Sequence, residues 1–214
     1  MVAGVVMVAG ALSPPVDGRA DATLAAHMVQ HVVLTMGAAP LLAAGLRRVP
    51  LTRSEGRSGP GIHPMIAWLL FAATGWVVHF TPLFETATGS IPVHVFEHAL
   101  LLGGGLLFWA QVVGRGATIS HPLRLLYLGL AMPQNTFVAL AIFSTGRVLY
   151  PHYGDGPDAL ADQRLAGGIM WVAGDLVLLV AVLAVAAGWA RHEERQNRLT
   201  EEAADQLPSP RTAG

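Results

Sequence analysis

Five long apolar segments constrain this chain more than any other feature of its sequence. They cover residues 24–46, 65–84, 93–113, 122–143 and 165–190. A helix of about 20 apolar residues can cross a hydrocarbon core of roughly 30 Å. Charged residues make up only 13% of the chain, about half the share found in soluble domains. We therefore expect an all-α, polytopic transmembrane helical bundle with five full spans in a lipid bilayer.

The two ends of the chain differ from these spans. The first apolar segment, residues 2–12, is too short to cross a membrane, and Ser13-Pro14-Pro15 ends it. It is typical of a truncated helix, a mis-assigned start or part of a signal-like segment. The end of the chain is charged and then rich in Pro and Ala. We assign residues 1–190 to the bundle and 191–214 to a cytoplasmic, partly disordered tail that begins as a helical extension.

The arginines predict the orientation, since the chain has no lysine. With alternating spans, two loops and the tail share one side of the membrane. That side holds Arg47, Arg48, Arg53, Arg57, Arg115, Arg124, Arg191, Arg195, Arg198 and Arg211, whereas the other side holds only Arg19, Arg147 and Arg164. The positive-inside rule places the arginine-rich side and the C-terminus in the cytoplasm. The lysine-free, Ala- and Arg-rich composition is typical of a GC-rich bacterial genome, so we expect a bacterial inner-membrane protein.

Two further counts narrow the function. The chain has no cysteine, which excludes disulfides, thiolate metal sites and a catalytic thiol. A bound metal would need His, Met, Asp or Glu as ligands. The formal net charge is −1, so nothing indicates binding to nucleic acid.

Histidines gather on the predicted outer side. His27 and His31, and likewise His94 and His98, are four residues apart, so each pair lies on one helix face. His79 ends a neighbouring span and can add a third imidazole. Imidazole suits copper, zinc, iron and nickel. The sequence therefore predicts a metal site at His27, His31, His79, His94 and His98, with Met28, Met36 and Met170 as soft ligand candidates nearby.

Other interpretations stay open. Isolated interfacial histidines often have only a structural role, which we prefer for His63, His121 and His192. His94-x-x-Glu97-His98 also matches the inverted zinc-protease motif, which predicts a membrane-embedded zinc-dependent hydrolase. A di-haem bundle is weaker, because haem ligands stacked across a bilayer lie further apart than four residues.

Polar residues outside these pairs have less certain roles. Pro133-Gln134-Asn135 lies near the middle of the fourth full span, and Gln134 or Asn135 can partner Asp175 in the last span. The long outer loop at residues 144–164 can cover the histidines. In that arrangement Glu97, His152 and Asp162 are candidates for groups that support the metal ligands; in the alternative, the acidic residues of the loop only solvate it.

The order of several motifs resembles the integral-membrane CtaG-type family of bacterial cytochrome c oxidase assembly proteins. The matching residues are His27-Met28-Val29-Gln30-His31, Leu34, Ala39-Pro40-Leu41-Leu42, Gly45, His94, Glu97-His98, Gly105 to Trp109, Tyr150-Pro151, Tyr153, Asp162-Gln163, Gly167, Met170-Trp171 and Gly174. They cover about residues 13 to 176. Family members are typically longer, with about seven spans, so the resemblance implies that a corresponding N-terminal portion is absent from this chain.

The resemblance implies a role in maturing a haem–copper oxidase, with oxidase subunits as partners. We therefore expect a non-enzymatic assembly factor that binds copper at the outer face through a shallow histidine site and hands it over. Zinc is the alternative metal, a metal-free assembly scaffold is the alternative function, and a homo-oligomer is compatible with either.

Overall fold

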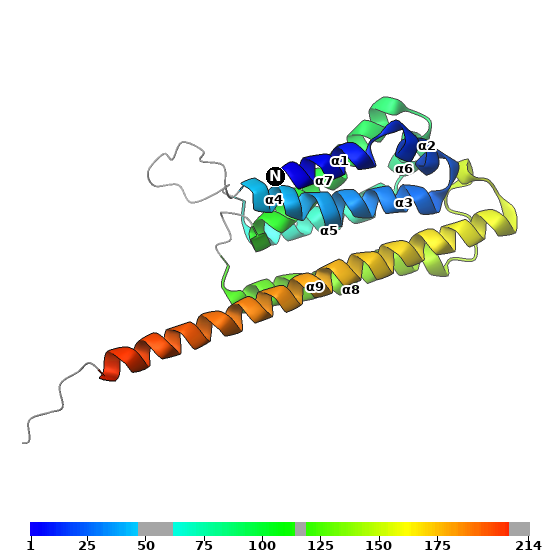
Figure 1. The fold of residues 1–214 in the computed structure, drawn as a ribbon. Helices are drawn as coiled ribbons and strands as arrows, with labels where there is room; N and C mark the ends of the chain where they lie inside the picture. Colours follow the sequence, from blue (N-terminus) through cyan, green and yellow to red (C-terminus); the bar gives the residue numbers. More distant parts are fainter. Residues whose placement is uncertain (47–61, 114–118, 206–214) are drawn as a thin grey trace, which may run out of the picture.

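The computed structural model describes residues 1–46, 62–113 and 119–205 (Figure 1). Its elements are α1 (Val2–Ala11), α2 (Pro14–Ala22), α3 (Leu24–Val32), the π-helix η1 (Val33–Ala38), α4 (Ala39–Leu46), α5 (Pro64–Phe80), α6 (Leu83–Thr88), α7 (Ile91–Val113), α8 (His121–Ser144), the 3₁₀-helix η2 (Pro151–Tyr153) and α9 (Gly156–Asp205). No strand occurs within these residues, so the predicted all-α class is confirmed.

Within the described residues, four helices are long and apolar enough to cross a membrane: the continuous rod Leu24–Leu46, α7, α8 and α9. Many large apolar side chains on these helices point outward, as Phe137 and Val172 do with 64% and 65% exposure. Contiguous exposed apolar surface of this kind marks contact with a membrane or a partner. The helices thus form a multi-pass membrane bundle.

The segment predicted as the second span is shorter than expected. Helix α5 ends at Phe80, with Thr81 in an extended conformation, because the residue before a proline is disfavoured in helical geometry. After Pro82 the chain turns into α6. At 17 residues α5 is a shorter apolar helix, and its crossing of the membrane stays a prediction.

Opposite ends of the bundle carry different features (Figure 1). Short elements α2, α6 and η2 gather at one end, where α3 and α7 begin. At the other end α4 and α7 finish, α8 begins, and the polar part of α9 extends beyond the bundle. The expected extension of the last span is thus helical to Asp205. The remaining tail, 206–214, and the loop arginines Arg47, Arg48, Arg53, Arg57 and Arg115 lie outside the described residues.

Polar contacts join α8 to α9 in the middle of the bundle. The Asn135 amide donates to Asp175 Oδ1 at 3.0 Å, and the Thr136 hydroxyl donates to Asp175 Oδ2 at 2.6 Å. Asn135 is thus the predicted partner of Asp175, and Thr136 is a second partner that the sequence did not indicate. An intramembrane carboxylate with two donors leaves fewer unsatisfied acceptors in the apolar interior.

Glycine allows the same two helices to approach closely. A Cβ atom at Gly167 would lie 2.9 Å from Ala139 O and 2.8 Å from Phe143 N, both backbone atoms of α8. Such close backbone contact is typical of small residues between membrane helices. Its neighbour Gly168 has more room, since the nearest atoms to a Cβ there are Phe143 ring carbons at 3.9 Å.

This difference predicts opposite effects of two neighbouring substitutions. Gly167→Ala should destabilise the bundle by about 1–3 kcal/mol, because α8 must move to relieve the overlap. Gly168→Ala is the matched control, since it gains the same helix propensity without the overlap. Thermal unfolding of the purified protein in detergent measures both. Equal midpoints for the two variants would show that α8 and α9 do not pack as described.

Candidate metal centre

Helices α3, α5 and α7 bring the five predicted histidines together. The ring centroid of His27 lies 5.2 Å from that of His94 and 5.9 Å from that of His98. His31 lies 5.4 Å from His98 and 5.6 Å from His79. The i,i+4 faces of α3 and α7 therefore point at each other. We call the five histidines together with Glu97 the histidine cluster.

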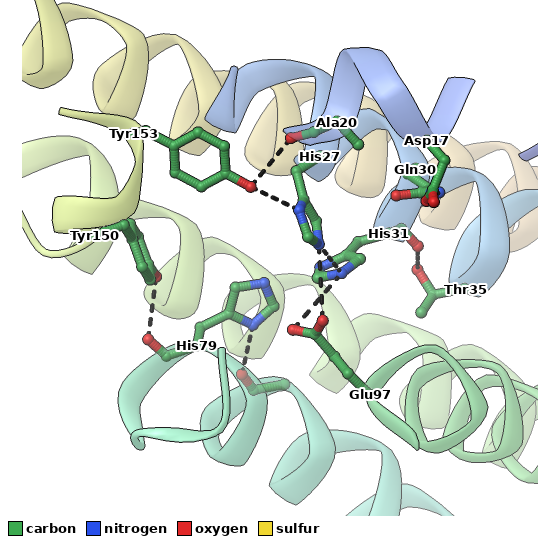
Figure 2. A network of polar contacts seen from close by, with 11 residues as sticks. Asp17, Ala20, His27, Gln30, His31, Thr35, His79, Glu97, Tyr150 and Tyr153 are labelled. Atoms are coloured by element: carbon green, nitrogen blue, oxygen red, sulfur yellow. Dashed lines mark hydrogen bonds and ion pairs between the residues drawn. The ribbon is translucent and has the colours of Figure 1, made fainter. Parts of the chain in front are cut away.

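Glu97, predicted as a supporting group or as the glutamate of the zinc-protease motif, lies inside this cluster. Its carboxylate oxygens are 3.7 Å from His27 Nε2 and 3.8 Å from His31 Nε2 (Figure 2). These distances are too long for hydrogen bonds. The residue is completely buried, so its carboxylate faces the imidazoles without contact to bulk solvent.

The start of α3 is held from two directions, which fixes His27 and His31. Thr23 caps the helix by accepting a hydrogen bond from Ala26 N. The Asp162 carboxylate of α9 accepts from Leu24 N at 2.7 Å and from Ala25 N at 3.1 Å. Helix starts leave backbone N–H groups without partners, and negative charge is favourable there. Asp162 therefore supports the cluster through the backbone of α3, while its described hydrogen bonds do not reach an imidazole.

Aromatic residues cover the cluster. The Phe84 ring of α6 lies 4.9 Å from that of His27, and Tyr150 and Tyr153 of the outer loop pack against Phe84. His27, His31, His79 and His98 are only 1%, 2%, 5% and 6% exposed. The predicted shallow site is therefore wrong: α6 and the loop at 144–164 bury the rings. His94 is the cluster histidine that keeps intermediate exposure.

Hydrogen bonds set which nitrogen of two histidines holds the proton. Tyr153 lies 2.7 Å from His27 Nδ1 and donates its own proton to Ala20 O (Figure 2). Burial raises the pKa of the Tyr153 hydroxyl, so this donor stays protonated. His27 Nδ1 must then donate to Tyr153. His79 Nδ1 likewise donates to Gly75 O at 2.7 Å. In both rings Nε2 carries the lone pair, which is the arrangement that metal-binding imidazoles adopt.

Several buried nitrogen and oxygen atoms of the cluster have no hydrogen-bond partner within the protein. His79 Nε2, His94 Nε2, His98 Nε2, His31 Nδ1 and both Glu97 oxygens are buried without a hydrogen-bond partner. An unsatisfied buried polar atom costs about 1–3 kcal/mol. So many in one place require an explanation, and binding of a cation is one of the ordinary ones.

One subset of the cluster could hold a single ion. His27, His94, Glu97 and His98 each offer one ligand atom, and these atoms lie within 4.8 Å of one another. We call these the four-residue group. Three imidazoles and a carboxylate suit zinc or copper. His31 adjoins the group, since its Nε2 is 3.0 Å from His27 Nε2, and His79 lies beyond His31.

The remaining histidines lie elsewhere. His152, a candidate supporting residue, is exposed, and its backbone N–H donates to Glu85. His63 caps α5 by accepting from Met65 N. His121 and His192 stack at the opposite end of the bundle, with ring centroids 5.7 Å apart. Their placement agrees with the structural roles expected for these three.

The family of the chain follows from comparison with known proteins. A family model described as cytochrome c oxidase caa3 assembly factor (Caa3_CtaG) matches residues 1–192. The chain belongs to this family. The predicted resemblance, which covered about residues 13 to 176, is thereby confirmed and extended to α1 and the end of the apolar part of α9.

Individual relatives of this chain occur in mycobacteria. Uncharacterized proteins of Mycobacterium bovis and Mycobacterium tuberculosis are each 28% identical over 207 residues, covering 82% of this chain and 31% of the relative. One from Mycobacterium leprae is 26% identical over 208 residues, with the same coverage. The chain therefore spans about a third of the length of these relatives. No solved structure matches it significantly.

Sequence reasoning placed Tyr153 only in a covering loop and missed its contact with His27. The one available signal was the family resemblance, which includes Tyr150-Pro151 and Tyr153. No local pattern relates the two residues, because 126 positions separate them.

Removal of the Asp162 charge tests how α3 is held. Asp162→Asn keeps one acceptor but loses the negative charge at the two N–H groups, so we expect a loss of about 1 kcal/mol in the free energy of unfolding. Asp155→Asn is the control, because Asp155 is exposed in the loop before α9. Denaturant or thermal unfolding in detergent measures both variants. If the two behave alike, the carboxylate does not cap α3.

Proposed function

We propose that this chain is a non-enzymatic assembly factor that binds copper at the outer face of a bacterial inner membrane and passes it to a cytochrome c oxidase subunit. The family supports the oxidase pathway. The observation that carries the copper proposal is the set of buried imidazole nitrogens and carboxylate oxygens in the histidine cluster that have no hydrogen-bond partner within the protein. A cation in the four-residue group would satisfy those of His94, Glu97 and His98.

The donor set favours copper among the biological metals. Copper binds nitrogen and oxygen ligands more tightly than zinc does in the divalent series. Buried thioethers near the cluster, on Met28, Met36 and Met170, add ligands suited to Cu(I).

Orientation and covering together suggest how copper would enter and leave. The positive-inside rule places the ends of α3, α5 and α7 that bear the cluster outside the cytoplasm. His94 is the more exposed ligand candidate, so it is the natural point of ligand exchange with an oxidase subunit. Transfer would then need only small movements of α6 and the outer loop over the other rings.

Two other functions make different predictions. A zinc-dependent hydrolase would use Glu97 to activate a metal-bound water, and it would need an open coordination position and a path for substrate. Phe84, Tyr150 and Tyr153 cover the cluster, which argues against that path. A metal-free scaffold would not explain why buried nitrogen and oxygen atoms of the histidine cluster have no hydrogen-bond partner within the protein.

Metal analysis of the purified chain tests the proposal. Wild type should bind Cu(I), and His94→Ala/His98→Ala should bind at least one copper per chain fewer, because both lost ligands belong to the four-residue group. His121→Ala/His192→Ala removes the same number of imidazoles from the opposite end and should bind as wild type does.

Equal copper in wild type and His94→Ala/His98→Ala would refute the copper site. Bound zinc, together with a hydrolytic activity that Glu97→Gln abolishes, would support the hydrolase. Normal oxidase assembly in cells that carry the double variant would support the scaffold.

The hydroxyl of Tyr153 gives a finer test. Tyr153→Phe leaves His27 Nδ1 without its partner, so copper affinity should fall about 10–100-fold, as it does when other such supporting groups are lost. Tyr150→Phe is the matched control, since the Tyr150 hydroxyl donates to a backbone oxygen, His79 O, at 3.0 Å. Competition with a Cu(I) chelator measures both affinities. A Tyr153→Phe affinity equal to that of wild type would exclude the supporting role.

A further inference from the structure

A cavity of about 50 Å³ lies directly beneath the histidine cluster. Its walls come from α3, η1, α5, α7, α8 and α9, so the long helices of the bundle all meet there. His31 and His79 line it together with two sulfur-containing side chains, Met36 and Met170. We call it the inner cavity. It would hold a few water molecules or an ion with protein ligands.

His79 is prepared as a ligand but does not belong to the four-residue group. Its Nδ1–H donates a hydrogen bond to Gly75 O, and its Nε2 is buried without a hydrogen-bond partner. Gly75 also lines the inner cavity. An imidazole oriented by a backbone carbonyl with its other nitrogen free is the arrangement of a metal ligand. The inner cavity supplies the place where that nitrogen could be used.

His31 adjoins both the four-residue group and the inner cavity. Since His27 Nε2 carries a lone pair, the 3.0 Å contact between the two Nε2 atoms requires His31 Nε2 to hold the proton. His31 Nδ1 then carries a lone pair, and it is buried without a partner. His31 is therefore a neighbour of the four-residue group through one nitrogen and keeps the other free.

The π-helix η1 brings a thioether to the same wall. It begins two residues after His31, and π-helical turns close at i+5 rather than i+4. In an α-helix Leu34 and Thr35 would share the face of His31, whereas here Met36, five residues on, lines the inner cavity. Isolated π-helical turns often occur at functional sites. Met170 faces the cavity from α9, and both methionines are at least nine-tenths buried, at 5% and 6% exposure.

Two polar side chains of the wall, those of Asn135 and Thr74, offer acceptor oxygens to a cation, whereas Gln134 offers both an acceptor and donors. Both amide protons of Asn135 are used, by Asp175 and by Met170 O, so the free atom of this side chain is an acceptor oxygen. The Thr74 hydroxyl donates to Leu70 O, which leaves its oxygen lone pairs. Both residues line the cavity.

We propose that the inner cavity is a second Cu(I) position, with His31, His79, Met36 and Met170 as ligands. Imidazole and thioether are ligands that suit Cu(I). Copper exchanges between the four-residue group and the inner cavity by replacement of ligands beside His31, without change of oxidation state. This inference rests on the proposed copper binding by the cluster.

X-ray absorption at the copper edge tests it sharply, because the chain has no cysteine and only methionine can supply sulfur. The full chain in detergent is loaded with excess Cu(I) in thiol-free buffer with ascorbate, desalted, and analysed for copper content and neighbouring atoms. Wild type should bind two copper ions per chain, with sulfur among the direct ligands.

Two pairs of variants separate the positions. Met36→Leu/Met170→Leu should lose one copper together with its sulfur ligands, while Met65→Leu/Met132→Leu, which alters two methionines outside the cavity wall, should keep both. His79→Ala should lose the sulfur-ligated copper, whereas His94→Ala should retain it. Leucine is close to methionine in volume, so these substitutions should cost less than about 1.5 kcal/mol.

The outcomes distinguish this inference from the proposed function. Copper bound only by nitrogen and oxygen in wild type, with equal amounts in the Met36→Leu/Met170→Leu variant, would mean that the cavity holds water, and the copper site of the cluster would stand. A wild type that binds no copper would overturn both.

Discussion

Burial of acceptor atoms away from water is the constraint on which the other features of this structure depend. Five imidazoles and one carboxylate share a space between α3, α5 and α7 where nearly every side chain is buried. Each unpaired acceptor there costs free energy, and like-directed lone pairs repel one another. Such an arrangement persists only where the surrounding elements hold each ring in place, and the cost falls when a cation binds.

The holding elements act mostly through the backbone. Asp162 and Thr23 fix the start of α3, which determines where His27 and His31 lie. Gly75 O and the Tyr153 hydroxyl orient His79 and His27 by accepting hydrogen bonds from their Nδ1–H groups. Close packing through Gly167 and polar contacts at Asp175 unite α8 and α9, and α9 in turn carries Asp162. The site and the bundle therefore depend on the same contacts.

The residues that cover the histidine cluster, and the burial of its side chains, limit what the cluster can do. Aromatic rings above it restrict access for large substrates, while intermediate exposure of His94 leaves one route for exchange. For the proposed copper handover, in which the ion must be released, a series of partial ligand sets serves better than a single closed site. The four-residue group and the inner cavity, which meet beside His31, could form such a series of ligand sets.

Much of the fold and part of the candidate site could be predicted from the sequence. Helix type, four of the spanning segments and the i,i+4 histidine pairs were predictable, because the helical period and the hydrocarbon thickness are local and fixed. The loops and the helix ends were harder to predict from the sequence. The shortening of α5 at Phe80 was signalled by Pro82 but overridden in the prediction by apolar Leu83 and Phe84, which belong instead to α6 above the cluster.

By itself, then, the sequence determined that His27 with His31, and His94 with His98, share helix faces, and that these faces lie near one end of a membrane bundle. Only the tertiary structure decided that the faces meet, that Glu97 lies between them and that Phe84 and Tyr153 cover them. It also separated His79 from the four-residue group and placed it beside Met36 and Met170. The reason is physical: the first set depends on the period of a single helix, whereas the second depends on contacts between residues up to 138 positions apart.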